Sequence, residues 1–216
     1  ARAYTMGLMR DAGLTTRIDT AGNIIGRKLG LEDSLPPIAM GSHIDTVPYG
    51  GKYDGALGVM GAIQTVRTLS DRGHTTRHPL EVIVFTNEEG TRYHRWLIGS
   101  RGMAGVLEKE DLDAVDDDGN GLGPCLADIG GDMSQIGEAV RKPGELAAYF
   151  ELHIEQGPYL YLSGTPIGVV TGITGRAVFE VDIEGKANHA GTTPMSSRRD
   201  ALVSASKLVL DIQKMA

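Results

Sequence analysis

Three apolar runs in this chain lead into groups of acidic and histidine residues, and this pattern restricts the fold. The runs cover residues 37–41, 80–86 and 148–154. Their lengths and apolar content are typical of buried β-strands. Polar residues at the carboxyl ends of strands are typical of open α/β sheets, which bind ligands at that edge. We therefore predict an α/β fold in which the polar groups meet at one edge of a sheet.

Helical and strand-like patterns alternate over the first part of the chain. Residues 56–70 carry apolar side chains at three-residue spacing, which predicts a helix ended by Gly73. A second helix is predicted over residues 1–10, followed by two short strands at 16–19 and 23–29. The expected architecture is a central β-sheet flanked by helices.

The pattern changes near residue 172, where we predict a domain boundary. Residues 178–184 alternate between apolar and polar side chains. A helix with one apolar face follows, and Ser197 and Asp200 are spaced as a capping box at its start. The prediction is one domain over residues 1–172 and the beginning of a smaller domain over residues 173–216.

Charge and cysteine content narrow the class of protein. The formal net charge of −7 argues against a nucleic-acid-binding surface. No apolar run approaches the ~18 residues that suggest a membrane span, and the amino end lacks a signal-peptide pattern. The single cysteine, Cys125, excludes an internal disulfide and fits a reducing compartment. We expect a cytoplasmic protein that binds neither nucleic acid nor membrane.

Both ends of the sequence suggest a piece of a longer chain. The first residue is Ala1 rather than Met, and a helical pattern is already under way at Tyr4 and Leu8. At the other end, a helical pattern through residues 207–210 runs on toward Ala216. We therefore expect an internal fragment.

Four motifs supply side chains suited to divalent metal ions. They are Gly-Ser-His-Ile-Asp at residues 41–45, Asp-Gly at 54–55, Asn-Glu-Glu-Gly at 87–90 and Glu-Leu-His-Ile-Glu-Gln at 151–156. Imidazole and carboxylate groups are common metal ligands, and a further carboxylate can act as a base. Together the motifs predict a site for two metal ions with one carboxylate left free.

Each motif has a plainer explanation when it is taken alone. His43 could be a loop histidine, although Asp45 can accept its second N–H and fix the ring tautomer. Asp54 is also suited to cap the helix that follows it. His153 could be a histidine of the core. All of these explanations would have to hold at once, so the metal site is the preferred interpretation.

Glu88 and Glu89 give the sharpest single indication. Adjacent carboxylates directly after an apolar strand repel each other unless a cation or a proton is present. One can bind metal while the other accepts a proton from metal-bound water. A solvated acidic turn is the alternative for this pair by itself.

Another acidic segment is interpreted as a turn. Residues 116–121 match the first half of a calcium-binding loop, but Ala127 stands where that loop requires glutamate. A solvated Asp/Gly turn is therefore predicted. The basic cluster within residues 72–78 is likewise predicted to be an exposed connection.

The motifs resemble those of the M20-type metallohydrolases, and most closely the branch of N-carbamoyl-L-amino acid hydrolases and allantoate amidohydrolases. The resemblance covers nearly the whole chain and includes Asn-His-Ala-Gly-Thr-Thr-Pro-Met at residues 188–195. It implies a zinc-exopeptidase-like catalytic domain and the start of an α+β, ferredoxin-like lid and dimerisation domain. Residues 94–96 depart from the small, proline-containing stretch that is usual in the family.

The resemblance implies how the metals would be held. His43, Asp54 and His153 would bind one ion, and Asp54 and Glu89 would bind the second, with Asp54 bridging. Asp45 would orient His43. The two ions would be Zn²⁺, Mn²⁺ or Co²⁺, since carboxylate and imidazole ligands suit all three. A further histidine ligand and an arginine for the substrate carboxylate would lie beyond residue 216.

The resemblance also implies the catalytic roles. Glu88 would be the general base and then the general acid. Gln156, Asn188 and His189 would contact substrate, and His189 would stabilise the oxyanion, often in the site of a partner subunit of a homodimer. The implied substrate is a small ureido or carbamoyl compound, such as an N-carbamoyl-L-amino acid or allantoate, which would release ammonia. The alternatives are a dipeptidase or aminopeptidase on the same scaffold, and a non-catalytic dimeric metal-binding protein.

Overall fold

The computed structural model describes residues 1–175 and 177–215 of the chain. These residues form two compact units, Ala1–Gly164 and Thr165–Ala216. The first unit contains the sheet and every predicted metal ligand, and the second contains His189 and the last helix. The predicted domain boundary at residue 172 stays a prediction.

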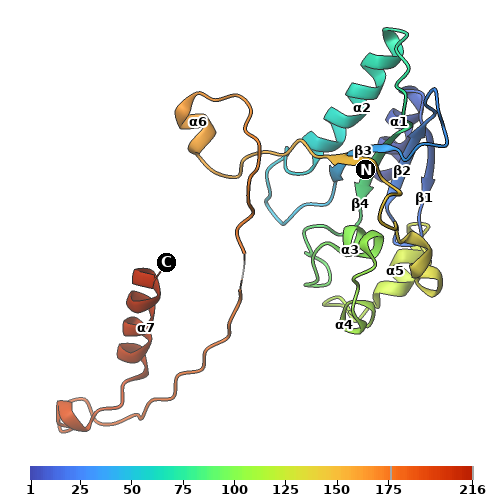
Figure 1. The fold of residues 1–216 in the computed structure, drawn as a ribbon. Helices are drawn as coiled ribbons and strands as arrows, with labels where there is room; N and C mark the ends of the chain where they lie inside the picture. Colours follow the sequence, from blue (N-terminus) through green and yellow to red (C-terminus); the bar gives the residue numbers. More distant parts are fainter. Residues whose placement is uncertain (176, 216) are drawn as a thin grey trace. The chain divides into compact units, whose positions relative to one another are not determined.

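The first unit is built from short strands and helices (Figure 1). The strands are β1 (Thr15–Ile18), β2 (Ile24–Lys28), β3 (Ile38–His43), β4 (Leu80–Phe85) and β5 (Ala148–Phe150). The helices are α1 (Arg2–Asp11), α2 (Ala56–Asp71), α3 (Ile98–Ala104), α4 (Lys109–Leu112), α5 (Leu122–Asp128) and α6 (Tyr159–Ser163), with the 3₁₀ helix η1 (Met133–Ala139). The predicted helices near residues 1–10 and 56–70 and the predicted strands before residue 90 are confirmed.

The five strands form one mixed sheet in the order β1-β2-β4-β3-β5. β1 and β2 are an antiparallel hairpin, and β2 runs antiparallel to β4. β3 is parallel to both β4 and β5, so the carboxyl ends of these three strands share one edge. The predicted α/β fold with a central sheet is confirmed, and this edge is where the polar motifs follow their strands.

Side chains of β4 alternate between the two faces of the sheet. Val82 and Val84 lie in a buried cluster with Val66 of α2, while Ile83 lies in a separate cluster with Met103 of α3. Helices therefore cover both faces. A strand buried on both sides reads as a continuous apolar run, which is why β4 is the clearest strand in the sequence.

One carboxylate interrupts the apolar run of β4. Glu81 is 2% exposed. Its carboxylate accepts hydrogen bonds from Arg27 Nη1 at 3.1 Å and from Arg141 Nη2 at 3.0 Å. A buried charge is tolerated when it is paired and hydrogen-bonded in this way.

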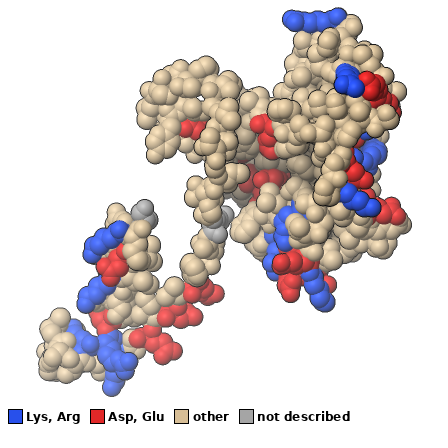
Figure 2. All heavy atoms as spheres, viewed as in Figure 1, with Lys and Arg blue, Asp and Glu red and all other residues tan. Residues whose placement is uncertain are grey.

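Elsewhere on the first unit, basic and acidic side chains alternate along the right-hand edge of the view in Figure 2.

β5 is shorter than predicted. The sequence pattern predicted a strand through residue 154, but β5 ends at Phe150 and His153 lies beyond it. Beyond Phe150 the backbone packs closely against α2 instead of pairing with β3, since a Cβ on Gly58 would stand 2.5 Å from the carbonyl oxygen of Leu152. The chain therefore leaves the sheet after Phe150 and passes over the beginning of α2.

The second unit contains the 3₁₀ helix η2 (Met195–Ser197) and α7 (Ala201–Met215), and the predicted last helix is confirmed. The predicted capping box is wrong, because Asp200 itself accepts the N–H groups of Leu202 and Val203 and so occupies the cap position. The alternating residues 178–184 form no strand. Among the described residues, no helix is long and apolar enough to cross a membrane.

Candidate metal centre

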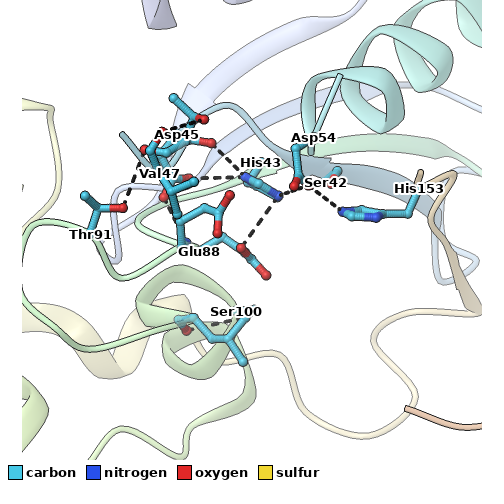
Figure 3. A network of polar contacts seen from close by, with 12 residues as sticks. Ser42, His43, Asp45, Val47, Asp54, Glu88, Thr91, Ser100 and His153 are labelled. Atoms are coloured by element: carbon cyan, nitrogen blue, oxygen red, sulfur yellow. Dashed lines mark hydrogen bonds and ion pairs between the residues drawn. The ribbon is translucent and has the colours of Figure 1, made fainter. Parts of the chain in front are cut away.

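The predicted metal ligands come from different segments at the shared sheet edge, and Figure 3 shows His43, Asp54 and His153 among them. His43 is the last residue of β3, Glu88 and Glu89 follow β4, and His153 follows β5. Asp54 lies in the loop between β3 and α2. Parallel pairing of the three strands therefore brings together residues that are far apart in the sequence.

Three ligand atoms converge around Asp54. Its Oδ1 lies 3.2 Å from His153 Nε2 and 3.7 Å from His43 Nε2. All three atoms lie within 4.8 Å of one another. Ligand atoms about 2 Å from a tetrahedral zinc ion stand about 3.3 Å apart. Both the spacing and the two-imidazole, one-carboxylate donor set therefore fit a divalent metal.

The other ring nitrogen of His43, Nδ1, lies beside Asp45. His43 Nδ1 lies 3.0 Å from the carbonyl oxygen of Asp45 and 3.6 Å from its Oδ1. In the neutral ring these acceptors favour the proton on Nδ1, which leaves the lone pair of Nε2 facing Asp54. The hydrogen bond at 3.0 Å is to the backbone carbonyl, so the predicted orienting role of the Asp45 carboxylate stays a prediction. Asp45 Oδ2 also accepts the backbone N–H of Glu89 at 3.0 Å, so it connects the ends of β3 and β4.

Burial and charge act in opposite directions on His43. Burial disfavours the imidazolium, but the hydrogen bond to Asp45 and the negative charge of Glu88 outweigh it and raise the pKa of His43 to about 9. The pKa of Asp45 is lowered, because bonds from His43 and the backbone N–H groups of Glu88 and Glu89 outweigh its burial. The site is therefore strongly attractive to a cation.

Gly55 leaves room for the His43 ring. Its φ is +60°, and a Cβ there would stand 2.5 Å from three atoms of the imidazole. A side chain at this position would therefore be strained and would also displace the ring. This explains the glycine that directly follows Asp54 in the second motif.

Glu88 and Glu89 form a second group with His43, again with ligand atoms within 4.8 Å of one another. Glu88 Oε2 is 3.6 Å from His43 Nε2. Burial raises the pKa of Glu88, with neighbouring Glu89 adding to the shift and His43 opposing it. His43 belongs to both groups but faces the site with one nitrogen, so it can bind one ion. The pairing of Glu89 with Asp54 across a second ion stays a prediction.

Gln156 contacts Asp54 directly. Its Nε2 donates to Asp54 Oδ2 at 2.7 Å, from a backbone with a φ of +55°. The two oxygens of Asp54 are thus divided, with Oδ1 facing the histidines and Oδ2 facing the amide. The predicted contact of Gln156 with substrate stays a prediction.

Asn188 and His189 belong to the second unit, where they line a cavity of about 350 Å³ together with Lys186. His189 Nδ1 accepts the backbone N–H groups of Gly191 at 3.0 Å and Thr192 at 3.2 Å. This arrangement leaves Nε2 as the protonated, donating nitrogen of the neutral ring. The predicted substrate-binding roles of Asn188 and His189 stay predictions.

Sequence reasoning did not single out Glu151, Ser42 or Tyr149 as part of the site. Glu151 accepts hydrogen bonds from the Ser42 hydroxyl and from the Tyr149 hydroxyl. The available signal was the position of Glu151 inside the fourth motif, two residues before His153.

The sheet edge and its two-histidine, multi-carboxylate centre define an α/β protein with a candidate site for divalent metal ions. The chain belongs to peptidase family M20/M25/M40, whose model matches residues 39–214. The predicted membership of this family is confirmed. The family implies divalent metal cofactors, and the candidate ligand groups described above agree with it.

Two curated relatives and one solved structure show the likeness along the whole chain. An N-carbamoyl-L-amino acid amidohydrolase of Geobacillus stearothermophilus is 44% identical over 216 residues, 100% of this chain and 53% of the relative. A ureidoglycolate hydrolase of Arabidopsis thaliana is 44% identical over 223 residues, 99% of this chain and 46% of the relative. A hydantoinase/carbamoylase family amidase of Burkholderia ambifaria has a TM-score of 0.82 at 37% identity, covering 99% and 52% of the two chains.

This chain spans about half the length of the curated relatives that it matches. The relatives are named as hydrolases of carbamoyl and ureido compounds rather than of peptides. The predicted likeness to the carbamoylase branch is therefore confirmed.

Proposed function

We propose that the full-length protein is a metal-dependent amidohydrolase that cleaves a C–N bond of an N-carbamoyl-L-amino acid or a related ureido compound such as allantoate. The observation that carries the proposal is the convergence of His43, Asp54 and His153 with Glu88 beside them. The names of the relatives support the substrate class.

The proposed cofactor is a pair of divalent ions, Zn²⁺, Mn²⁺ or Co²⁺. His43, Asp54 and His153 would hold one ion, and Asp54 and Glu89 would contribute to the second. Bound ions of this kind act as Lewis acids and lower the pKa of coordinated water. The spacing of the first three ligand atoms supports this assignment.

Glu88 is proposed to move the proton. Its carboxylate lies 3.6 Å from His43 Nε2 and its pKa is raised by burial, which favours a group that both accepts and returns a proton. Water adds to the ureido carbon, Glu88 takes one of its protons, and the same proton is delivered to the leaving nitrogen. The C–N bond then breaks and ammonia leaves. With a carbamoyl amino acid, the remaining carbamate loses carbon dioxide.

The orienting groups are Asp45, which fixes the ring of His43, and the amide-bearing side chains Gln156 and Asn188. His189, whose Nε2 is the donating nitrogen, is proposed to stabilise the oxyanion. The full-length protein is proposed to be a cytoplasmic homodimer, in which the second domain contributes the dimer contact.

Ammonia release by the full-length protein loaded with Mn²⁺ or Zn²⁺ tests the proposal. The substrates to compare are allantoate, several N-carbamoyl-L-amino acids, 3-ureidopropionate and ureidoglycolate. Glu88→Gln is expected to lower kcat by at least 10²-fold while metal stays bound. Glu138→Gln is the matched control, because Glu138 is exposed on η1. Full activity in Glu88→Gln would contradict the role of Glu88.

The two alternatives give different results in the same experiment. A peptidase would cleave dipeptides and release no ammonia from the ureido compounds. A metal-binding scaffold would bind metal and turn over neither class. The names of the relatives do not favour either alternative.

A further inference from the structure

A single carboxylate connects the two segments that carry the histidines. Glu151 Oε1 accepts the Ser42 hydroxyl at 2.6 Å, and Glu151 Oε2 accepts the Tyr149 hydroxyl at 2.9 Å. Ser42 is 1% exposed and directly precedes His43, while Glu151 stands two residues before His153. The bond to Ser42 joins residues that are 109 positions apart in the sequence.

This bond lies where backbone pairing stops. The β3–β5 ladder pairs Ile38 with Ala148 and ends with Met40 opposite Phe150. β3 continues to His43, whereas β5 ends at Phe150 and no longer pairs with it. Without ladder hydrogen bonds, the segment after Phe150 depends on side-chain contacts for its position. The Glu151 carboxylate supplies the next connection along the same edge.

On its other side, the segment after Phe150 packs against α2. A Cβ on Gly58 would meet the carbonyl oxygen of Leu152 at 2.5 Å and the Cβ of Ser42 at 2.8 Å. The backbone of Leu152 therefore rests against the helix while the side chain of Glu151 is fixed to β3. These two contacts fix the two residues that precede His153. The rings of His43 and His153 stand 6.1 Å apart as a result, with Asp54 in reach of both.

We propose that Glu151 is a positioning residue that sets the distance between His43 and His153 by binding Ser42 and Tyr149. The inference rests on the proposed metal-binding role of the two histidines. Glu151 belongs to neither ligand group among the described residues, and both of its oxygens accept a hydroxyl. It therefore acts on the metal through the geometry of His153 and does not touch the metal itself.

The test is the metal affinity of the full-length protein, measured by chelator competition with Zn²⁺ and with Mn²⁺. Loss of a group that orients a metal ligand typically costs 10–100-fold in metal affinity, and we expect a loss in this range for Glu151→Ala. The number of ions bound at saturation should stay unchanged. Glu138→Ala is the matched control and should bind metal as the wild type does.

Two further variants separate positioning from general stability. Glu151→Gln retains one carbonyl acceptor and one donor for the two hydroxyls, so it should recover most of the affinity. Ser42→Ala should weaken affinity in the wild type but add little to Glu151→Ala, because the bond it removes is already absent. The thermal midpoint of the metal-free protein should change little in Glu151→Ala.

Unchanged metal affinity in Glu151→Ala would overturn the inference, and so would the loss of one bound ion, which would make Glu151 a ligand. Additive losses for Ser42→Ala and Glu151→Ala would also contradict it. A wild-type protein that binds no metal would instead overturn the proposed function, and the inference with it. The two failures are therefore distinguishable.

Discussion

Several side chains of this protein have two polar atoms, and the contact made by one atom determines which way the other faces. His43 faces the candidate metal group with Nε2 because Asp45 occupies the side of Nδ1. Asp54 divides its oxygens between the histidines and Gln156. His189 shows the same principle with backbone donors in place of a carboxylate.

At the scale of single residues, the first prediction concerns the tautomer of His189. Two backbone N–H groups point at Nδ1, so the neutral ring should carry its proton on Nε2. The ¹⁵N chemical shifts of the labelled full-length protein would show this directly. Arg198 stabilises the loop that carries these N–H groups, because it donates hydrogen bonds to the carbonyl oxygens of Thr193 and Ala190. Arg198→Met should therefore give mixed tautomers, whereas an Nδ1-protonated ring in the wild type would contradict the prediction.

Asp116 provides a pH prediction. Burial opposes its charge, but hydrogen bonds from the backbone and side chain of Asn120 and from Arg92 lower the pKa from 3.8 to about 2. A carboxyl whose pKa is lower in the folded protein stabilises the fold above pH 3.8, and this stabilisation is lost as the pH falls toward about 2. The predicted Asp/Gly turn is present, but Asp116 is buried in it rather than solvated and accepts hydrogen bonds from Asn120 and Arg92.

Asp116→Asn should be less stable than the wild type at neutral pH, and the difference should shrink as the pH falls through this range. Denaturant unfolding at a series of pH values measures it. Asp128→Asn is the matched control, since Asp128 is exposed at the end of α5. A difference that stays constant with pH would show that the charge of Asp116 contributes nothing.

At the scale of elements, the sheet edge is assembled by close contact between α2 and the segment after β5. Gly58→Ala would place a methyl 2.5 Å from the Leu152 carbonyl oxygen. Overpacking of this kind typically costs 1–3 kcal/mol of stability, and we expect a loss of about that size together with weaker metal binding. Gly7→Ala in α1 is the control, because a Cβ there meets nothing within 4 Å.

Gly7→Ala should stabilise the protein by about 0.5–1 kcal/mol, the usual gain from replacing glycine within a helix. Denaturant unfolding of both variants gives the comparison. A similar gain in Gly58→Ala would mean that Leu152 can move away from α2 at no cost. Loss of stability with unchanged metal affinity would mean that His153 is positioned independently of this contact.

At the scale of the whole molecule, ligands from four separate segments make metal binding and folding interdependent. An ion that binds only the folded protein stabilises it by about 2.7 kcal/mol at a hundredfold excess over Kd. Zn²⁺ or Mn²⁺ should therefore raise the thermal midpoint of the full-length protein, and a chelator should reverse the shift. His153→Ala should lose most of it, while His74→Ala, at an exposed position after α2, should keep it. An equal shift in both variants would contradict the assigned ligand group.

The sequence alone determined the elements whose patterns are local. The apolar run of β4 and the three-residue spacing in α2 predicted those elements within a residue or two, and the motifs placed His43, Glu88 and Glu89 near strand ends. Family membership also followed from short motifs. These features depend on neighbours within a few positions, so a linear sequence records them.

Tertiary structure decided what depends on contacts between distant residues. β5 ends at Phe150, the backbone of Leu152 packs against α2, and Glu151 reaches Ser42 across 109 positions. The apolar pattern continues through residue 154, and nothing local in it marks either contact. Asp54 was predicted as a ligand from its motif, but its division between two histidines and Gln156 follows only from the loop's position beside β3 and β5. Local pattern fixes the kind of element, whereas packing between elements fixes where each one ends and which atoms meet.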